Sequence, residues 1–142
     1  MNPFLLDVNL LVAMVWPSQV HYRAARRWFA ANRGSGFRTC PITQAGMVRV
    51  LSNPRHGRDG LTMAEAQGGL AELVALPEHE FWAAHLSLSE AIERVGPISG
   101  HQQITDAYLV ALAIANGGIL ATFDRGVLGL RGAKGNVELI TS

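Results

Sequence analysis

The chain has 142 residues, of which 49% are hydrophobic and 16% are charged. This composition predicts one folded domain and excludes a disordered chain. A net charge of +1 excludes a protein whose whole surface binds nucleic acid through charge, so any basic surface has to be local. The single cysteine, Cys40, excludes an internal disulfide framework and a cysteine-based zinc cluster.

The N-terminal part of the chain predicts a buried strand followed by a helix. Residues 4–6 are an uninterrupted apolar run, which is typical of a strand buried on both faces, and Asp7 stands at its carboxyl end. We interpret the apolar residues 1–19 as part of this first strand and not as a signal peptide, because they lack a positive start and contain Asp7. Ser18 is expected to cap a helix over residues 21–33.

Two further helices are expected in the next part of the chain. Pro41 lies in the first turn of one of them, and Pro54 ends it. In the other helix, Thr62 and Glu65 form a capping box, and the helix runs to about Ala75.

The C-terminal half alternates strand and helix patterns. The expected elements are, in order, a strand over residues 79–85, a helix over 88–96, a helix over 104–115, a strand over 118–122 and a last strand over 136–140. Thr105 or a neighbour is expected to cap the helix over 104–115. The alternation predicts a single α/β domain over residues 1–142, with three layers (α/β/α) and a mostly parallel central sheet.

Three aspartates stand where such a sheet would bring them together. Asp7 ends the first strand, Asp124 follows the strand over 118–122, and Asp106 begins a helix that can point back over the same edge. In open parallel sheets, sites form at the carboxyl ends of the strands. Carboxylates that share a cleft repel one another and are costly to bury, and a hard cation such as Mg²⁺ or Mn²⁺ resolves this conflict. The joint pattern therefore favours a metal site.

Each of these aspartates also has a simpler interpretation. An aspartate before a helix is usually an N-cap, and one after a strand is usually a turn residue. The residues alone leave both interpretations open.

Three segments carry a resemblance to a known family: "LLDVNLLVAMV", "PITQAGMVRVLSNP" and "ITDAYLVALAIANGGILATFDRG". In this order they resemble the PIN-domain family, and more closely the VapC toxins of bacterial type II toxin–antitoxin systems. The resemblance covers nearly the whole chain and implies a PIN-like fold with three layers.

The activity that the resemblance implies is that of a Mg²⁺- or Mn²⁺-dependent endoribonuclease, which hydrolyses RNA phosphodiester bonds with a metal-activated water. Asp7, Asp106 and Asp124 match the acidic metal-binding positions of the family. The family usually has a further acid on the helix after the first long loop, and Gln44 takes that place here. Glutamine offers a carbonyl oxygen but no charge. Gln44 is therefore expected to take part in catalysis but to hold the metal less tightly than glutamate would.

The resemblance also implies partners: a cognate VapB-type antitoxin, an RNA substrate and a second copy of the chain in a homodimer. A cytoplasmic location is expected, since the single cysteine fits a reducing cytosol. No membrane contact is expected, because no apolar stretch is long enough to span a bilayer. Trp16, Trp28, Phe29 and Trp82 are candidates for the core or for a groove that accepts an antitoxin helix.

Four further residues are candidates to support the aspartates. Asn9 could bond the Asp7 carboxylate or a metal-bound water, and the hydroxyls of Thr105 and Thr122 could orient carboxylates. Arg49 could reach a phosphate or the partner protein. Turn, capping, strand-packing and surface roles explain these residues equally well. The basic segments "RAARRW" and "NPRHGR" could guide RNA along the rim of the cleft.

An alternative function is left open by Gln44. Without the usual acid at this position, the chain could be a PIN-like module that binds RNA or protein and has weakened catalysis. Metal binding and RNA cleavage by the isolated protein would distinguish the two functions.

Overall fold

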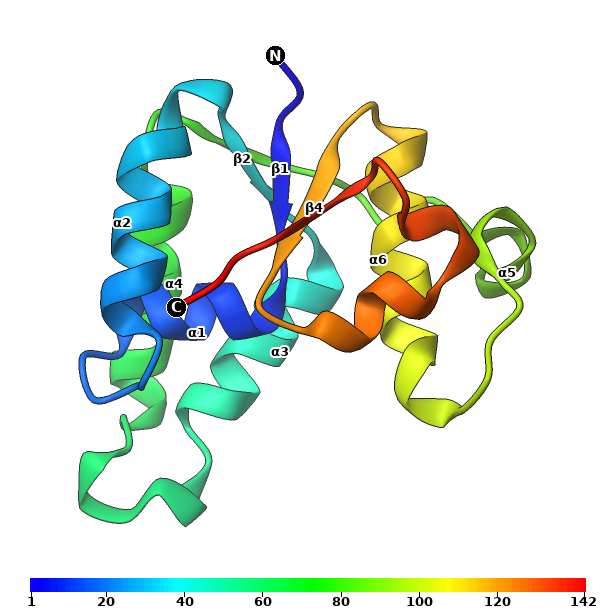
Figure 1. The fold of residues 1–142 in the computed structure, drawn as a ribbon. Helices are drawn as coiled ribbons and strands as arrows, with labels where there is room; N and C mark the ends of the chain where they lie inside the picture. Colours follow the sequence, from blue (N-terminus) through cyan, green and yellow to red (C-terminus); the bar gives the residue numbers. More distant parts are fainter.

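A five-stranded parallel sheet forms the centre of the computed structural model, which describes residues 1–142 (Figure 1). In chain order the strands are β1 (Phe4–Leu6), β2 (Phe37–Thr39), β3 (His79–Phe81), β4 (Ile119–Thr122) and β5 (Val137–Leu139). They lie side by side in the order β3-β2-β1-β4-β5. This arrangement confirms the predicted α/β fold, and the sheet is entirely parallel.

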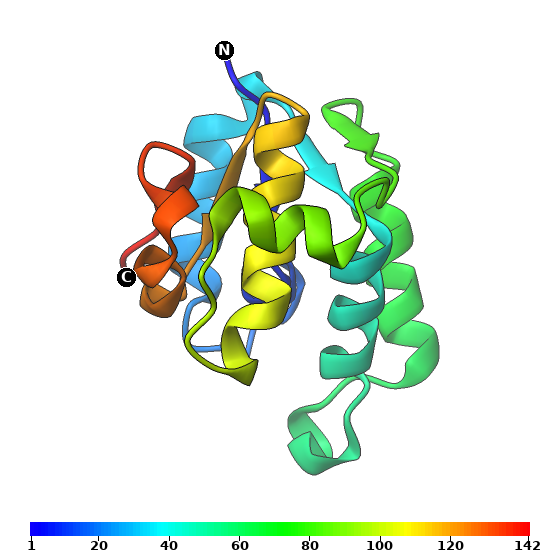
Figure 2. The ribbon, with the colours of Figure 1, turned by 90° about the vertical axis from the view of Figure 1, so that its right-hand side faces the viewer.

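Helices cover both faces of this sheet (Figures 1 and 2). They are α1 (Val8–Val15), α2 (Tyr22–Asn32), α3 (Pro41–Leu51), α4 (Met63–Val74), α5 (Leu88–Val95) and α6 (Ile104–Ala115). Helices α1 to α4 share one core cluster with one face of the sheet, and α5 and α6 share a second cluster with the other face. None of the helices combines the length and the apolar character needed to cross a bilayer.

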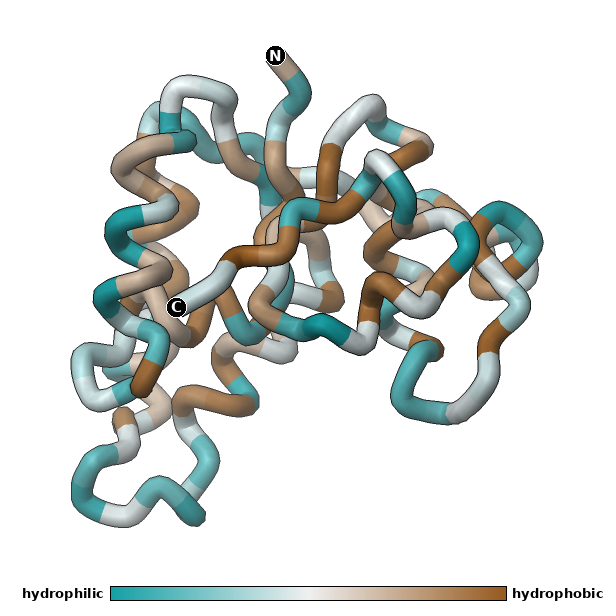
Figure 3. Tube along the Cα trace, in the orientation of Figure 1, coloured by the Kyte–Doolittle hydropathy of each residue, from teal (hydrophilic) through white to brown (hydrophobic).

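Strand β1 shows how the sequence pattern produces these two cores. Its side chains alternate between the faces of the sheet: Phe4 and Leu6 belong to the cluster beneath α1 to α4, and Leu5 belongs to the cluster beneath α5 and α6. The prediction of a strand buried on both faces is therefore confirmed. Hydrophobic residues concentrate at the centre of the molecule, whereas the loop that follows α3 is hydrophilic (Figure 3).

The interpretation of residues 1–19 as one strand was wrong, because helix α1 begins at Val8, directly after Asp7. Residues Leu10–Met14 are all buried, so α1 is apolar nearly all round. A buried helix of this kind cannot be distinguished from a buried strand by hydrophobic periodicity. The Oδ1 atom of Asp7 accepts a hydrogen bond of 2.7 Å from the Val8 amide, so Asp7 does cap this helix.

Two predicted caps were also wrong. Helix α2 begins after His21, whose side chain makes no capping hydrogen bond, and Ser18 lies in the preceding turn. Helix α6 continues directly from a 3-10 turn over His101–Gln103, which places Thr105 inside the helix. Strand β2 was missed, because three residues with Arg38 at the centre are too few to show a strand pattern.

Candidate active site

The three predicted aspartates line one cavity at the carboxyl edge of the sheet. Asp7 follows β1, Asp124 lies two residues beyond the end of β4, and Asp106 is in the first turn of α6. The cavity has a volume of about 320 Å³. Because β1 and β4 are parallel neighbours, their carboxyl ends meet at this edge, as in other parallel sheets. The topology thus brings Asp7, near the start of the chain, together with Asp106 and Asp124, near its end.

Asp7 is the most firmly held of the three. Only 6% of its surface is exposed, and each carboxylate oxygen accepts one hydrogen bond of 2.7 Å, Oδ1 from the Val8 amide and Oδ2 from the Thr122 hydroxyl. Burial raises the pKa of Asp7, the two hydrogen bonds lower it, and the charge of Asp124 raises it further. The net shift is upward, so the buried charge is not fully compensated within the protein.

Thr122 and Asn9 connect Asp7 to Asp124. The fully buried Thr122 hydroxyl accepts hydrogen bonds from the Asn9 side-chain amide (3.1 Å) and from the Asp124 backbone amide (3.0 Å). The Asn9 carbonyl oxygen accepts one from the Phe123 amide at 3.2 Å. These bonds tie the start of α1 to the end of β4. Thr122 contacts the Asp7 carboxylate directly, whereas Asn9 bonds Thr122 and Phe123 and not, as predicted, Asp7 itself.

Asp106 carries the largest electrostatic conflict. Its half-buried position, followed by the charges of Asp7 and Asp124, raises the pKa of its carboxyl group from 3.8 to about 6. Asp124 is the more solvated partner, and its Oδ1 accepts a hydrogen bond of 2.8 Å from the Gly126 amide. Three mutually repelling carboxylates in one cavity therefore lack a neutralising group.

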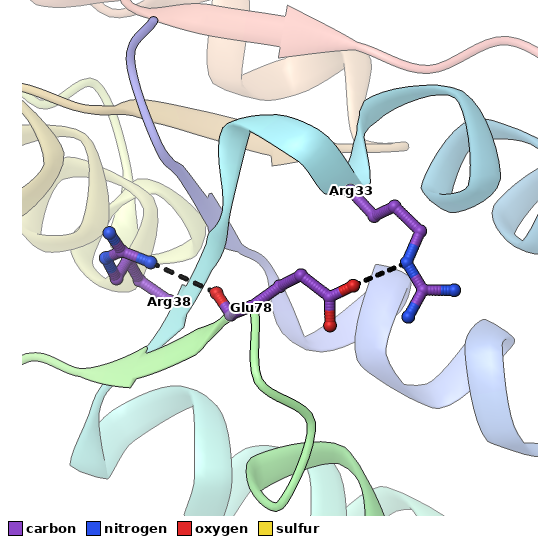
Figure 4. Close-up of polar contacts among 3 residues, drawn as sticks. All are labelled: Arg33, Arg38 and Glu78. Atoms are coloured by element: carbon purple, nitrogen blue, oxygen red, sulfur yellow. Dashed lines mark hydrogen bonds and ion pairs between the residues drawn. The ribbon is translucent and has the colours of Figure 1, made fainter.

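The ion pairs of the protein lie outside the aspartate cavity, on β2, β3 and the segments that precede them. Arg33 pairs with Glu78 at 2.6 Å and Arg38 pairs with Glu80 at 2.8 Å. Arg38 also donates to the Glu78 backbone carbonyl at 3.3 Å, so both arginines contact the residue that precedes β3 (Figure 4). These contacts fix the amino ends of β2 and β3. They bring no positive charge to the aspartate cavity.

The chemistry of the cavity fits a hard divalent cation. Carboxylate and amide oxygens are the ligands that Mg²⁺ and Mn²⁺ prefer, and a cation would relieve the repulsion that raises the pKa of Asp106. No group of three histidine, cysteine or acidic side chains is already close enough together to hold a metal ion. Asp7, Asp106 and Asp124 are the residues of the cavity that would hold such a cation.

Three of the predicted residues lie outside this cavity. The Gln44 amide donates a hydrogen bond of 2.9 Å to the Thr39 hydroxyl, which also contacts the His79 ring at 2.7 Å. Gln44 thus serves the packing of α3 against β2 and β3, and a carboxylate in its place would lie beside Thr39. Thr105 and Arg49 are exposed on their helices, and neither lines the cavity.

Besides Val8 and Val12 of α1, two cavity residues were missed from the sequence. Gln19, from the turn after α1, and Val50, near the end of α3, both line the cavity. Neither belongs to a motif or stands at a strand end, so no sequence signal distinguishes them. Their position follows from the packing of α1 against α2 and α3.

The family of the chain follows from comparison with known proteins. Residues 4–131 match the model of the PIN domain. The chain belongs to the PIN-domain family. Among the relatives of this PIN domain is Ribonuclease VapC38 of Mycobacterium tuberculosis, which is 44% identical over 139 residues, 96% of this chain and 97% of the relative.

Two solved structures share the fold of this PIN domain. VapC20 of Mycobacterium tuberculosis superposes on this chain with a TM-score of 0.68 at 16% identity. The match covers 97% of this chain and 99% of the VapC20 chain. A chain in the crystal structure of VapBC2 from Rickettsia felis bound to promoter DNA has a TM-score of 0.67 at 14% identity, over 97% and 98% of the two chains. The predicted membership of the PIN family and the relation to VapC proteins are thus confirmed.

Proposed function

We propose that this PIN domain is a metal-dependent endoribonuclease and the toxin of a type II toxin–antitoxin module. The observation that carries the proposal is the cavity in which Asp7, Asp106 and Asp124 meet without a neutralising group. The ribonuclease name of a relative with 44% identity over nearly the full length of both chains supports the same reaction. Asp7, Asp106 and Asp124 would hold Mg²⁺ or Mn²⁺.

Each residue of the site would have a separate role in holding the metal. When bound, the cation supplies a water of lowered pKa as nucleophile and offsets charge on the departing oxygen. Asp7 presents its carboxylate in one direction, because both oxygens are held by hydrogen bonds. Asn9 and Thr122 hold Asp7 and the Asp124 backbone in fixed positions relative to each other. Asp106 is only half buried and can approach the cation from the helix.

Electrostatic attraction of RNA would come from the loop that follows α3. This hydrophilic loop (Figure 3) carries Arg55 and Arg58, both exposed. It is fastened to the body of the protein by the Trp16 indole, which donates to the Asp59 carbonyl at 2.7 Å, and by the His56 ring, which contacts the Val50 carbonyl at 2.9 Å. Because the His56 ring contacts Val50, which lines the aspartate cavity, the loop adjoins the cavity wall, and its arginines would contact a phosphate backbone that leads into the site.

The experiment that tests the proposed function is cleavage of a mixed RNA pool by the purified protein, free of antitoxin. We expect cuts with Mg²⁺ or Mn²⁺ and none with EDTA. A folded protein that cuts no RNA with either metal would favour the alternative, a binding module with weakened catalysis. The glutamine at position 44, in place of the usual acid, gives that alternative little support, because its side chain bonds Thr39 outside the cavity.

The antitoxin would bind in an apolar groove between α1, α2 and α4, of about 660 Å³. Met14, Phe29 and Leu73 form part of its floor, and such grooves accept the apolar face of an amphipathic helix. Of the four aromatic candidates for the core or for such a groove, Phe29 lines the groove. The three tryptophans do not: they pack against His56 (Trp16), Phe4 (Trp28) and Arg38 (Trp82). The homodimer and the cytoplasmic location stay predictions.

A single charge in this groove should separate antitoxin binding from catalysis. Ala30 is exposed and lines the groove, so Ala30→Arg would place a cation and extra bulk where an apolar side chain has to dock. We expect the variant to lose co-purification with the cognate antitoxin and to keep wild-type RNA cleavage. The matched control is Ala31→Arg, an exposed position on the same helix outside the groove. Retention of the antitoxin by Ala30→Arg would place its binding site elsewhere.

A further inference from the structure

A second recess opens beside the aspartate cavity. Its volume is about 490 Å³, and its walls are formed by the loop before α6, the first turn of α6 and the turn after β4. Asp106 and Asp124 line both this recess and the aspartate cavity. A group bound in the recess would therefore lie next to the carboxylates proposed to hold the metal.

The lining of the recess is polar, and its acidic groups are Asp106 and Asp124. Apart from the two aspartates and two glycines, it consists of Ser99, His101, Gln102 and Gln103. No arginine or lysine is available for a phosphate, and no Phe, Tyr or Trp provides a stacking surface. Amides, a hydroxyl and an imidazole are instead the groups that read base edges and ribose hydroxyls.

The loop that forms the recess is held in a defined shape. The Gln103 carbonyl oxygen accepts hydrogen bonds of 2.9 Å from both the amide and the hydroxyl of Ser99. On its other side, the Gln103 amide nitrogen reaches the turn after Asp124, since a Cβ atom at Gly129 would lie 3.3 Å from it. The 3-10 turn over His101–Gln103 then continues into α6. A recess that exists before the ligand arrives binds at a lower entropic cost.

Two side chains of the recess remain available for a ligand. The oxygen of Gln103 is occupied by Ser99, whereas Gln102 and His101 are exposed to solvent on the recess wall. A glutamine amide pairs with a base edge through a donor and an acceptor at once, and an imidazole can bond a hydroxyl or stack on a base.

We propose that this recess binds one unstacked RNA nucleotide beside the phosphodiester that is cut, with Gln102 and His101 contacting its base edge or ribose hydroxyls. The volume lies within the range of small-molecule sites, and a polar lining with two carboxylates and no arginine or lysine fits an uncharged nucleoside and not a phosphate. The proposal rests on the proposed ribonuclease function. It adds that the nucleotide next to the cut is selected by hydrogen bonding in this recess.

The test compares Gln102→Ala and His101→Ala with the wild type on synthetic RNAs that share one mapped cut site and differ in the nucleotide beside it. Gln67→Ala and His85→Ala, both exposed and outside the recess, are the matched controls. We expect the recess variants to raise KM about tenfold, to leave kcat and Mn²⁺ affinity unchanged, and to alter the preferred nucleotide beside the cut. The controls should match the wild type.

The outcomes separate this proposal from the proposed function. If the wild type cuts RNA and both recess variants have the same KM and the same cut sites, the recess does not bind the substrate. If the wild type cuts no RNA, the ribonuclease proposal fails, and the recess is judged by the fluorescence anisotropy of labelled RNA in Ca²⁺. Weaker RNA binding by Gln102→Ala than by Gln67→Ala would support the recess. Equal affinity, or no binding by the wild type, would overturn it.

Discussion

Asp7→Asn and Asp106→Asn are each expected to lower the rate of metal-dependent RNA cleavage by more than about 100-fold, because loss of a metal ligand should cost at least as much as loss of a residue that orients one. Both changes keep the size of the side chain and remove its charge. Asp7 is buried with two hydrogen-bond donors, and Asp106 faces the charges of Asp7 and Asp124. Initial rates on a defined RNA with Mn²⁺ would measure the effect.

The matched control is Asp59→Asn, which alters the remaining aspartate of the chain, exposed and outside the cavity. Circular dichroism would verify that all three variants are folded. Cleavage by Asp7→Asn or Asp106→Asn within about twofold of the wild type would reject the metal-site assignment for that residue.

Affinity for Mn²⁺ should fall about tenfold for each pH unit below 6, because a proton then competes with the metal for Asp106. The pKa of this carboxyl group is about 6 in the folded protein without metal, and the pKa of Asp7 is also raised. Calorimetric titrations at pH 7.5, 6 and 5 would give the slope. In Asp106→Asn the affinity should be lower at pH 7.5 and depend less on pH. An identical pH profile in both proteins would exclude Asp106 as a ligand.

Without metal, the free energy of unfolding should rise as the pH falls, whereas the affinity for Mn²⁺ falls. The pKa of Asp106 rises on folding from 3.8 to about 6, so the folded state binds this proton more tightly than the unfolded state. The resulting stabilisation is complete below about pH 4 and is lost as the pH rises through about 6. Discounted for solvent screening of a half-exposed group, the difference is about 1 kcal/mol.

Urea denaturation in EDTA would measure this effect as the free energy of unfolding. At pH 7.5, Asp106→Asn should be more stable than the wild type by about 1 kcal/mol, and below pH 4 the two should be equal. Mn²⁺ should reverse the order at pH 7.5, because the wild type binds it more tightly. A variant that is less stable in EDTA at pH 7.5 would mean that Asp106 mainly stabilises the first turn of α6.

The sequence by itself determined the fold class and the positions of most elements. Strand β1 is apolar on consecutive residues because both of its faces are covered, and helix α4 has a capping box of Thr62 and Glu65 that forms as expected. Local rules suffice there, because caps and strand patterns depend on neighbours in the chain. They also placed Asp7, Asp106 and Asp124 at element ends, from which a parallel sheet carries them to one edge.

Only the tertiary structure decided the identity of α1, the place of Gln44 and the second recess. Because α1 is buried, it is apolar nearly all round, and the spacing of its hydrophobic residues does not distinguish a helix from a strand. Gln44 stands on a helix near the expected position, but its amide turns to Thr39, a contact between segments that no local pattern specifies. The recess of Ser99, His101, Gln102 and Gln103 faces Asp124 because α6 packs beside β4. Long-range packing of this kind depends on the whole fold and not on the spacing of residues along the chain.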